Sequence, residues 1–222
     1  MHTDIAFFTN QAFYNGKLGI VPLPHQTKEL SEEAEESNGI ARMLKTSRVA
    51  FVEAELPEHS VSEKVNQNEA DIIAATIKSI YEIEKDRFDA DKTIGVIVPY
   101  RNQISAVRKT VQKLGIEALN GITIDTVERF QGSQRDYIIY GFTVQKIYQL
   151  NFLTSNVFTD TDGVVVDRKL NVALTRAREH MIITGNSRLL SKNSIFSKLL
   201  SYIKKNGTYI DVSKENYCNG NF

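Results

Sequence analysis

The sequence predicts an α/β fold in which helices cover both faces of a mainly parallel sheet. Strand-like apolar segments alternate along the chain with segments whose apolar residues recur at helical spacing, an order typical of parallel sheets. Residues 93–98 form a nearly continuous apolar run that ends at Pro99, as expected for a strand buried on both faces. Residues 68–84 repeat Ile and Ala at helical spacing and predict a long helix. Ligands of such sheets bind at the carboxyl ends of the strands, so the segments that follow strands are the first candidates for function.

The amino-terminal part of the chain predicts a helix over residues 3–14, which Asn15-Gly16 breaks, and then a short strand over 18–22. Residues 22–47 are polar, and their acidic run 29–36 predicts an exposed loop or a solvated helix rather than a ligand site.

The remainder of the chain continues the alternation without a repeat or a low-complexity linker, so residues 1–222 are predicted to form one domain. The other predicted strands are 48–55, 122–125, 137–143 and 180–184, and the other predicted helices are 103–114, 170–178 and 195–204.

Charge and cysteine content exclude several classes of protein. The 27 basic and 27 acidic residues cancel, which excludes a binder that holds nucleic acid by bulk positive charge alone. Cys218 is the only cysteine, so no internal disulfide can form and a cytoplasmic location is expected. No apolar run approaches the roughly 18 residues needed to cross a bilayer, so no membrane partner is expected. The four histidines have no ligands at metal-binding spacing, so no metal site is expected.

The first candidate segment is Pro99-Tyr100-Arg101-Asn102-Gln103, directly after the 93–98 strand. An aromatic ring and polar groups stand here at the start of a predicted helix, whose free N–H groups and positive dipole end favour a phosphate. Many strand-to-helix turns share this pattern, so the segment is a weak signal by itself.

The second candidate segment is residues 125–137, which are mostly polar or glycine and lie between two apolar strands. Gly132 allows a ligand to approach the backbone closely, and Thr126 and Gln131 supply neutral hydrogen-bonding groups. The alternative is a capped connecting loop, although such loops are more often shorter and richer in Pro, Asn and Ser.

The third candidate segment is residues 170–178, predicted as one helix that brings Asn171, Leu174 and Arg178 together and turns Arg176 elsewhere. Two arginines on an otherwise apolar helix are costly to bury unless they meet anions. The alternative is a surface salt bridge.

In this order, the three segments resemble motifs IV, V and VI in the second motor domain of superfamily-one helicases of the upframeshift and nonsense-mediated-decay branch. Asn66-x-x-Glu69-Ala70 also matches a helix start that recurs in this family, and Met1-His2 resembles the end of its Tyr-Arg-Met-His motif, inside which the chain is expected to begin. The resemblance covers residues 1–205. The matching segments are Val98-Pro99-Tyr100-x-x-Gln103, Thr126-Val127-x-x-Phe130-Gln131-Gly132-x-x-x-Asp136 and, nearly identical to the family pattern, Asn171-Val172-Ala173-Leu174-Thr175-Arg176-Ala177-Arg178.

The resemblance implies a RecA-like domain of the P-loop NTPase type that closes on ATP and magnesium while it grips single-stranded DNA or RNA. No Gly-x-x-x-x-Gly-Lys-Ser/Thr sequence occurs in the chain, so the phosphate and magnesium sites are expected on an amino-terminal RecA-like partner domain. This chain alone is expected to be inactive.

The resemblance also implies roles for individual residues. Arg176 is the expected catalytic arginine finger on the γ-phosphate, and Arg178 fixes the helix or transmits closure. Gly132, Gln134 and Arg178 are expected at the nucleotide, and Tyr100, Gln103, Thr126 and Gln131 are expected at the nucleic acid, without sequence readout.

The chain departs from the family pattern in three places. Gln134 stands where the family usually has a glutamate that is expected to contact the ribose, and the arginine of the Tyr-Arg-Met-His motif is missing because the chain starts after it. Residues 145–166 are longer than expected and are predicted to be an insertion or a substrate-facing or mobile loop.

Two other functions remain open from the sequence. A non-catalytic nucleic-acid-binding module could retain the helicase fold, although the intact Thr175-Arg176 argues against it. A self-contained nucleotide-binding α/β enzyme is disfavoured because the chain has no glycine-rich phosphate loop.

Overall fold

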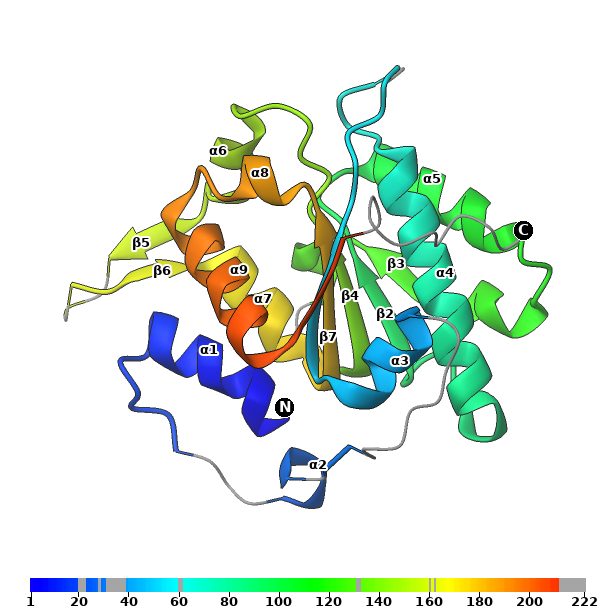
Figure 1. The fold of residues 1–222 in the computed structure, drawn as a ribbon, viewed down its shortest axis with the longest axis horizontal. Coiled ribbons are helices and arrows are strands. Elements are labelled where there is room, and N and C mark those ends of the chain that lie inside the picture. The colour runs from blue at the N-terminus through cyan, green and yellow to red at the C-terminus, as the bar shows by residue number, and fades with distance from the viewer. Residues whose placement is uncertain are drawn as a thin grey trace.

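The computed structural model describes residues 1–19, 23–27, 29–30, 39–59, 62–130, 133–159, 161 and 163–211. Within these residues, a six-stranded parallel sheet has the strand order β3-β2-β4-β7-β1-β8 (Figure 1). The predicted α/β class with a mainly parallel sheet is therefore confirmed. The strands are β1 (Val49–Glu53), β2 (Ile94–Ile97), β3 (Thr123–Asp125), β4 (Arg135–Gly141), β7 (Ala177–Gly185) and β8 (Thr208–Ile210).

Helices cover both faces of this sheet and complete the three layers of the fold (Figure 1). One face is covered by α1 (Thr3–Phe13), α7 (Arg168–Arg176) and α9 (Ser194–Asn206), and the other by α3 (Gly39–Thr46), α4 (Gln67–Glu84) and α5 (Arg101–Gln112). The shorter helices are α2 (Pro24–Thr27), α6 (Gln149–Leu153), α8 (Ser187–Leu190) and the 3-10 turns η1 (Lys85–Arg87), η2 (Glu117–Gly121) and η3 (Val127–Phe130).

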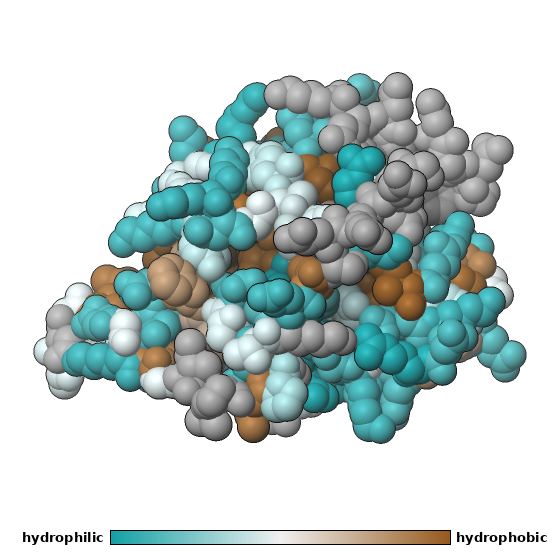
Figure 2. All heavy atoms as spheres, turned by 60° about the horizontal axis from the view of Figure 1, so that its bottom comes forward, coloured by the Kyte–Doolittle hydropathy of each residue, from teal (hydrophilic) through white to brown (hydrophobic). Residues whose placement is uncertain are grey.

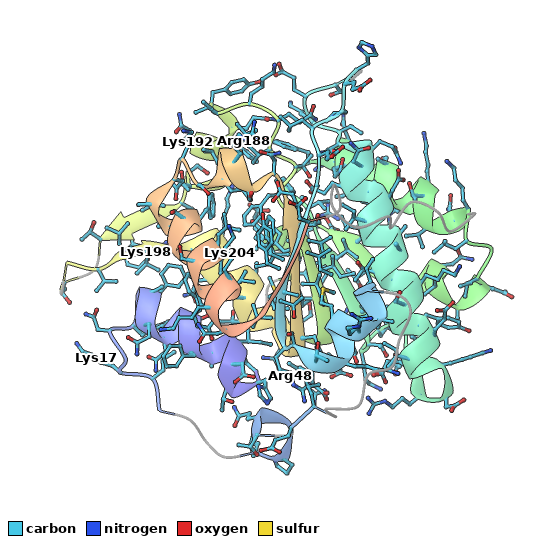
Figure 3. All side chains as sticks on the ribbon, in the orientation of Figure 1. Lys17, Arg48, Arg188, Lys192, Lys198 and Lys204 are labelled. Carbon is cyan, nitrogen blue, oxygen red and sulfur yellow. The ribbon has the colours of Figure 1, made fainter. Side chains whose placement is uncertain are left out.

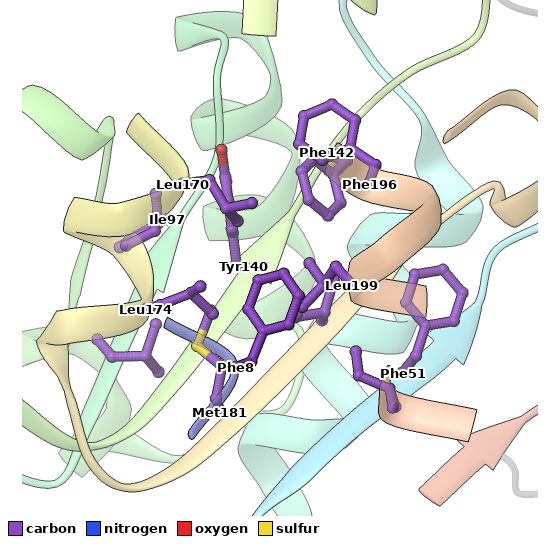
Figure 4. Packing of buried hydrophobic residues seen from close by; sticks show 14 of the residues in the cluster. Phe8, Phe51, Ile97, Tyr140, Phe142, Leu170, Leu174, Met181, Phe196 and Leu199 are labelled. Carbon is purple, nitrogen blue, oxygen red and sulfur yellow. The ribbon is translucent and has the colours of Figure 1, made fainter. Parts of the chain in front are cut away.

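A hydrophobic core lies on each face of the sheet because side chains alternate along a strand. In β7, Met181 and Ile183 pack with Leu174 of α7 and Leu199 of α9, in the core that Figure 4 shows. Ile182, between them, packs in the opposite core with α3, α4 and α5. The central strands are buried on both faces, and this is why their sequences are nearly all apolar.

Several of the long helices, α4 and α7 among them, start at side-chain caps. At the start of α4, the backbone N–H of Glu69 donates to Asn66 Oδ1 at 3.2 Å. At the start of α7, the backbone N–H of Leu170 donates to Asp167 Oδ1 at 3.0 Å. Each cap satisfies a backbone donor that has no partner within its own helix, so the cap fixes where the helix begins.

The prediction of a polar loop or solvated helix over residues 22–47 is wrong for its carboxyl-terminal part. Residues 39–46 form α3, and Ile40, Ala41, Met43 and Leu44 bury its apolar face against α4 and the sheet. The acidic composition of the neighbouring residues hid this short amphipathic pattern. Of the strand predicted over 18–22, residues 18–19 are not in a strand, and 20–22 lie outside the described residues, as do 31–36 of the acidic run.

Residues 145–166 contain regular structure. They include α6 and an antiparallel hairpin formed by β5 (Val157–Thr159) with β6 (Val165–Asp167), which projects from the body of the domain (Figure 1). None of the helices in the described part of the chain is long and apolar enough to cross a membrane.

The helix predicted over residues 170–178 is wrong at both ends. It begins two residues earlier, at Arg168, with Asp167 as its cap, and it ends at Arg176. Ala177 directly begins β7, where it pairs with Arg135 of β4. The short strand β8, which pairs with β1 at the edge of the sheet, is missing from the prediction.

Candidate functional site

The candidate residues lie at two opposite edges of the sheet. All strands are parallel, so their amino ends meet at one edge and their carboxyl ends at the other. Gln134 precedes β4 and Arg176 precedes β7, whereas Tyr100 follows β2 and Thr126 follows β3. The third segment follows β6 of the hairpin rather than a strand of the six-stranded sheet, and it ends at the amino end of β7.

At the amino-end edge, the residues before β4 and β7 are neighbours. Gln134 is exposed, and its Nε2 donates to the backbone oxygen of Thr175 at 3.4 Å. The strand register, which pairs Arg135 with Ala177, brings these segments together. This side of the molecule, at the bottom of Figure 1, is turned toward the viewer in Figure 2 and is covered mainly by hydrophilic side chains.

Arg176 is held by neutral acceptors. Its Nε donates to the backbone oxygen of Val172 at 3.3 Å, and its Nη2 donates to Thr175 Oγ1 at 3.2 Å. The side chain is half-buried, and no carboxylate of the described residues forms an ion pair with it. Its positive charge therefore has no partner within this part of the chain.

Arg178 lies on β7 rather than on a helix, which corrects the prediction that groups it with Asn171 and Leu174. Its Nη1 lies 3.4 Å from Asp136 Oδ1, and its backbone oxygen accepts a hydrogen bond from His2 N at 2.7 Å. Burial raises the pKa of Asp136, while the charge of Arg178 opposes that shift. These contacts tie the start of α1 to the amino ends of β4 and β7.

At the carboxyl-end edge, Tyr100 occupies the N-cap position of α5 and stacks on Phe152 of α6, with ring centroids 5.3 Å apart and planes 19° apart. Lys169 Nζ lies 4.4 Å from the centroid of the same Phe152 ring. Burial raises the pKa of the Tyr100 phenol, and its hydrogen bond with Gln149 opposes that shift. Phe152 is 45% exposed, so this aromatic and cationic cluster is open to solvent.

Thr126 stands between β3 and η3, where its backbone N–H donates to Asp125 Oδ1 at 2.8 Å. Its side chain also forms a hydrogen bond with the carboxylate of Glu128. Burial acts to raise the pKa of Glu128, but the hydrogen bonds to its carboxylate and the charge of Lys169, 3.5 Å away, outweigh burial and lower it. Glu128 therefore stays ionised beside Thr126.

Gln103 does not fit the predicted contact with nucleic acid. Its side chain is fully buried, and its Oε1 accepts from Asn66 N at 2.9 Å while its Nε2 donates to Asn66 O at 3.0 Å. This pair of hydrogen bonds joins α5 to the start of α4, so Gln103 supports the neighbouring Tyr100 from within the fold. Gln131 and Gly132 lie outside the described residues.

Two segments of the chain connect the amino-end edge of the sheet to its carboxyl-end edge. Residues 126–134 run from the carboxyl end of β3 to the amino end of β4, and η3 within them packs against α7. The nine residues of α7 span about 13 Å at 1.5 Å per residue, from the hairpin at Asp167 to Arg176 before β7.

The sequence reasoning missed two features. Phe152 and Lys169 are absent from the predicted site because the first lies in the stretch predicted as an insertion and the second precedes the third motif. From His180 to Ile210 the chain has no acidic residue, and none of the exposed cations there forms an ion pair with a described carboxylate. The run of like charge could have been read from the sequence. These cations are Arg188, Lys192, Lys198, Lys204 and Lys205, the first four labelled in Figure 3.

A three-layer parallel sheet with an unpaired arginine on the helix before a strand, and with aromatic and polar groups after two other strands, defines the class of RecA-like motor domains. Comparison with known proteins identifies the family of this chain. A family described as "AAA domain" matches residues 1–188. The chain belongs to this family and is a RecA-like domain of the superfamily-one helicase type.

Curated relatives agree with this assignment. Regulator of nonsense transcripts 1 of Dictyostelium discoideum is 32% identical over 162 residues, which cover 70% of this chain and 11% of the relative. DNA-binding protein SMUBP-2 of Mesocricetus auratus is 26% identical over 98% of this chain and 21% of the relative. DNA replication ATP-dependent helicase/nuclease DNA2 of Xenopus tropicalis is 29% identical over 96% of this chain and 20% of the relative. The chain thus spans between 11% and 21% of the length of these relatives.

Proposed function

We propose that this chain completes the ATP site of a DNA or RNA helicase together with an amino-terminal RecA-like domain, and that it grips single-stranded nucleic acid. ATP and magnesium are held mainly by the phosphate-binding loop of that partner domain. Arg176 and Gln134, with Gly132 nearby in sequence, meet the nucleotide from the amino-end edge of the sheet. Tyr100 and Thr126, with Gln131, contact the strand from the carboxyl-end edge. Helicases among the relatives support this assignment.

The observation that carries the proposal is the unpaired guanidinium of Arg176. A half-buried cation with only neutral acceptors gains most from an anion outside its own domain. Its planar fork matches two phosphate oxygens, and it neutralises the charge that grows on the γ-phosphoryl group during transfer. The contact is stronger in the transition state than in the ground state, so it raises the rate of hydrolysis more than it tightens ATP binding.

The two sites are coupled through α7. Its carboxyl-terminal end carries Arg176, and its amino-terminal turn carries Lys169, which contacts Phe152 and Glu128 at the other edge. Closure on ATP moves this helix and the motif V segment packed on it together. Such movement changes the grip on the strand because ATP favours one of two domain arrangements.

The test is the rate of nucleic-acid-stimulated ATP hydrolysis in the polypeptide that joins this domain to its phosphate-binding partner. We expect Arg176→Ala to lower kcat by about 10³- to 10⁵-fold and to leave strand binding without ATP unchanged. Arg176→Lys should restore little, because a point charge does not reproduce the fork. Lys205→Ala removes an exposed cation from α9 and should hydrolyse ATP like the wild type.

A mutant Arg176→Ala that melts like the wild type and keeps kcat within about threefold would assign Arg176 to the surface and overturn the proposal. If the unmodified two-domain polypeptide binds single strands but hydrolyses no ATP, the chain is instead a non-catalytic binding module.

A further inference from the structure

A cavity of about 470 Å³ lies beside the motif V segment, between the β5–β6 hairpin, α7 and the end of α1. Its volume falls in the range of about 300–1,000 Å³ typical of small-ligand sites. Val127 and Glu128, which directly follow Thr126, form part of its wall. The cavity therefore borders the proposed path of the strand. The hairpin and α7 contribute Phe158, Val166, Arg168, Lys169, Asn171 and Val172.

The wall offers a stacking surface. Phe158 is 38% exposed, and the guanidinium carbon of Arg168 lies 4.5 Å from the centroid of its ring. Aromatic rings and guanidinium planes are the groups on which proteins stack unpaired bases. Arg168 forms no ion pair with a carboxylate of the described residues, so its guanidinium, which lies over the ring, is available to a phosphate.

Polar groups suited to the edge of a base line the same cavity. Asn171 Nδ2 donates to the hydroxyl of Tyr14 at 2.9 Å, and Asn171 Oδ1 is buried without a hydrogen-bond partner. Asn156 adds a second amide, and Glu128 adds a carboxylate that can accept from an exocyclic amino group. Lys169 neutralises the charge of Glu128. The cavity therefore has an excess positive charge, which comes from Arg168.

We propose that this cavity binds one unstacked base of the single strand that crosses Tyr100 and Thr126. The base stacks on Phe158, its edge meets the amides, and Arg168 contacts an adjacent phosphate. This inference rests on the proposed function, because it assumes that a single strand lies along the carboxyl-end edge. The stretch 145–166, which lengthens the chain between motifs V and VI, then serves to build a base-binding pocket.

The test is equilibrium binding of fluorescein-labelled oligo-dT of about 12 nucleotides, within the site sizes of single-strand binders, to the 222-residue chain without nucleotide. We expect Phe158→Ala to weaken binding about tenfold, as for the loss of one base–aromatic stack. Phe158→Leu keeps an apolar side chain in the hairpin and should lose affinity to the same extent. Phe7→Ala, which removes another exposed aromatic ring from α1, should bind like the wild type.

The salt dependence of strand binding distinguishes the phosphate contact of Arg168 from the base stacking on Phe158. Arg168→Ala should reduce the slope of log K against log salt by about 0.7, the value for one phosphate contact on a single strand. Phe158→Ala should leave this slope unchanged. Lys198→Ala, which removes a cation from α9 (Figure 3), is the matched control and should change neither slope nor affinity.

The outcomes distinguish the pocket from the function on which it rests. If Tyr100→Ala and Thr126→Ala weaken binding but both Phe158 variants bind like the wild type, the pocket is overturned and the proposed strand path stands. If none of these variants weakens binding, both are overturned. Equal losses with Phe158→Ala and Phe7→Ala would also overturn the pocket, because the effect would not be specific to it.

Discussion

The carboxylate of Glu69 is buried at the start of α4. The side chain is fully buried, and its oxygens accept hydrogen bonds from the backbone N–H of Thr143 at 2.9 and 3.0 Å and from the Thr143 hydroxyl at 3.0 Å. Burial raises the pKa of Glu69 to about 8, although the bonds from Thr143 oppose the shift. Thr143 has a φ of +51°, so Glu69 helps to hold a backbone conformation that few residues adopt. This anchor sets the path of the chain after β4.

Stability should therefore depend on pH through Glu69. The folded chain keeps the proton up to a pH of about 8, whereas the unfolded chain releases it near the ordinary pKa of about 4.3. The folded state binds more protons in this interval, so the free energy of unfolding falls as pH rises, by at most about 1.4 kcal/mol per pH unit. Urea unfolding between a pH of about 6.5 and 8 measures the slope.

Glu69→Gln should flatten that slope, because the amide keeps an acceptor for Thr143 and cannot ionise. His180, whose pKa burial and the charge of Arg48 lower to about 3, contributes a slope of opposite sign near its ordinary pKa of about 6.5, and this contribution is the same in the wild type and in the variant. Glu82→Gln, on the exposed side of α4, is the control and should keep the wild-type slope. If Glu69→Gln keeps it as well, another group is responsible.

At the scale of elements, Gly95 of β2 allows the motif V turn to pack closely against this strand. A Cβ on Gly95 would lie 2.8 Å from Phe130 Cε1 of η3, 2.9 Å from Arg135 Cγ and 3.0 Å from Ile138 Cδ1. Phe130 is fully buried, so it has little room to give way. The absence of a side chain at Gly95 thus lets the segment between the two edges of the sheet lie close against β2.

Gly95→Ala should destabilise the chain by about 1–3 kcal/mol, the usual cost of overpacking, and should weaken single-strand binding because η3 follows Thr126 directly. The measurements are urea unfolding and binding of oligo-dT. Gly19→Ala is a matched control, since a Cβ there meets no atom within 4 Å. Equal stability of the two variants would show that η3 has other room to move.

The elements differ in how well the sequence predicts them, for physical reasons. β2 and α4 follow from residues 93–98 and 68–84, because strong apolar periodicity reports burial directly. α3 is missed because four apolar side chains suffice to bury a short helix within a polar stretch. Arg178 is placed on a helix because the sequence pattern continues through it, whereas pairing with β4 ends the helix at Arg176. Gln103 matches a motif, but only the tertiary structure shows that it is buried.

At the scale of the whole molecule, this chain provides one wall of the proposed ATP site. The sequence contains no Gly-x-x-x-x-Gly-Lys-Ser/Thr loop, the segment that cradles the β- and γ-phosphates and places the magnesium ion in P-loop NTPases. We expect the purified chain to hydrolyse no ATP, with or without single-stranded DNA, in an assay of phosphate release. Turnover that persists in the variant Arg176→Ala of the same chain would contradict the division of the site between two domains.

Because α7 continues directly into β7, the number of residues in this segment fixes how its side chains are placed between the two edges of the sheet. Inserting or deleting one residue in α7 would rotate Arg176 by about 100° around the helix axis. The same change in β7 would exchange the two faces of the strand and turn Met181 and Ile183 into the opposite core. We therefore expect residues 168–176 and 181–185 not to tolerate a change of length, whereas between Ala177 and His180 the register of β7 against β4 shifts by one residue. Insertions between motifs V and VI have to enter before Asp167, and the β5–β6 hairpin lies there.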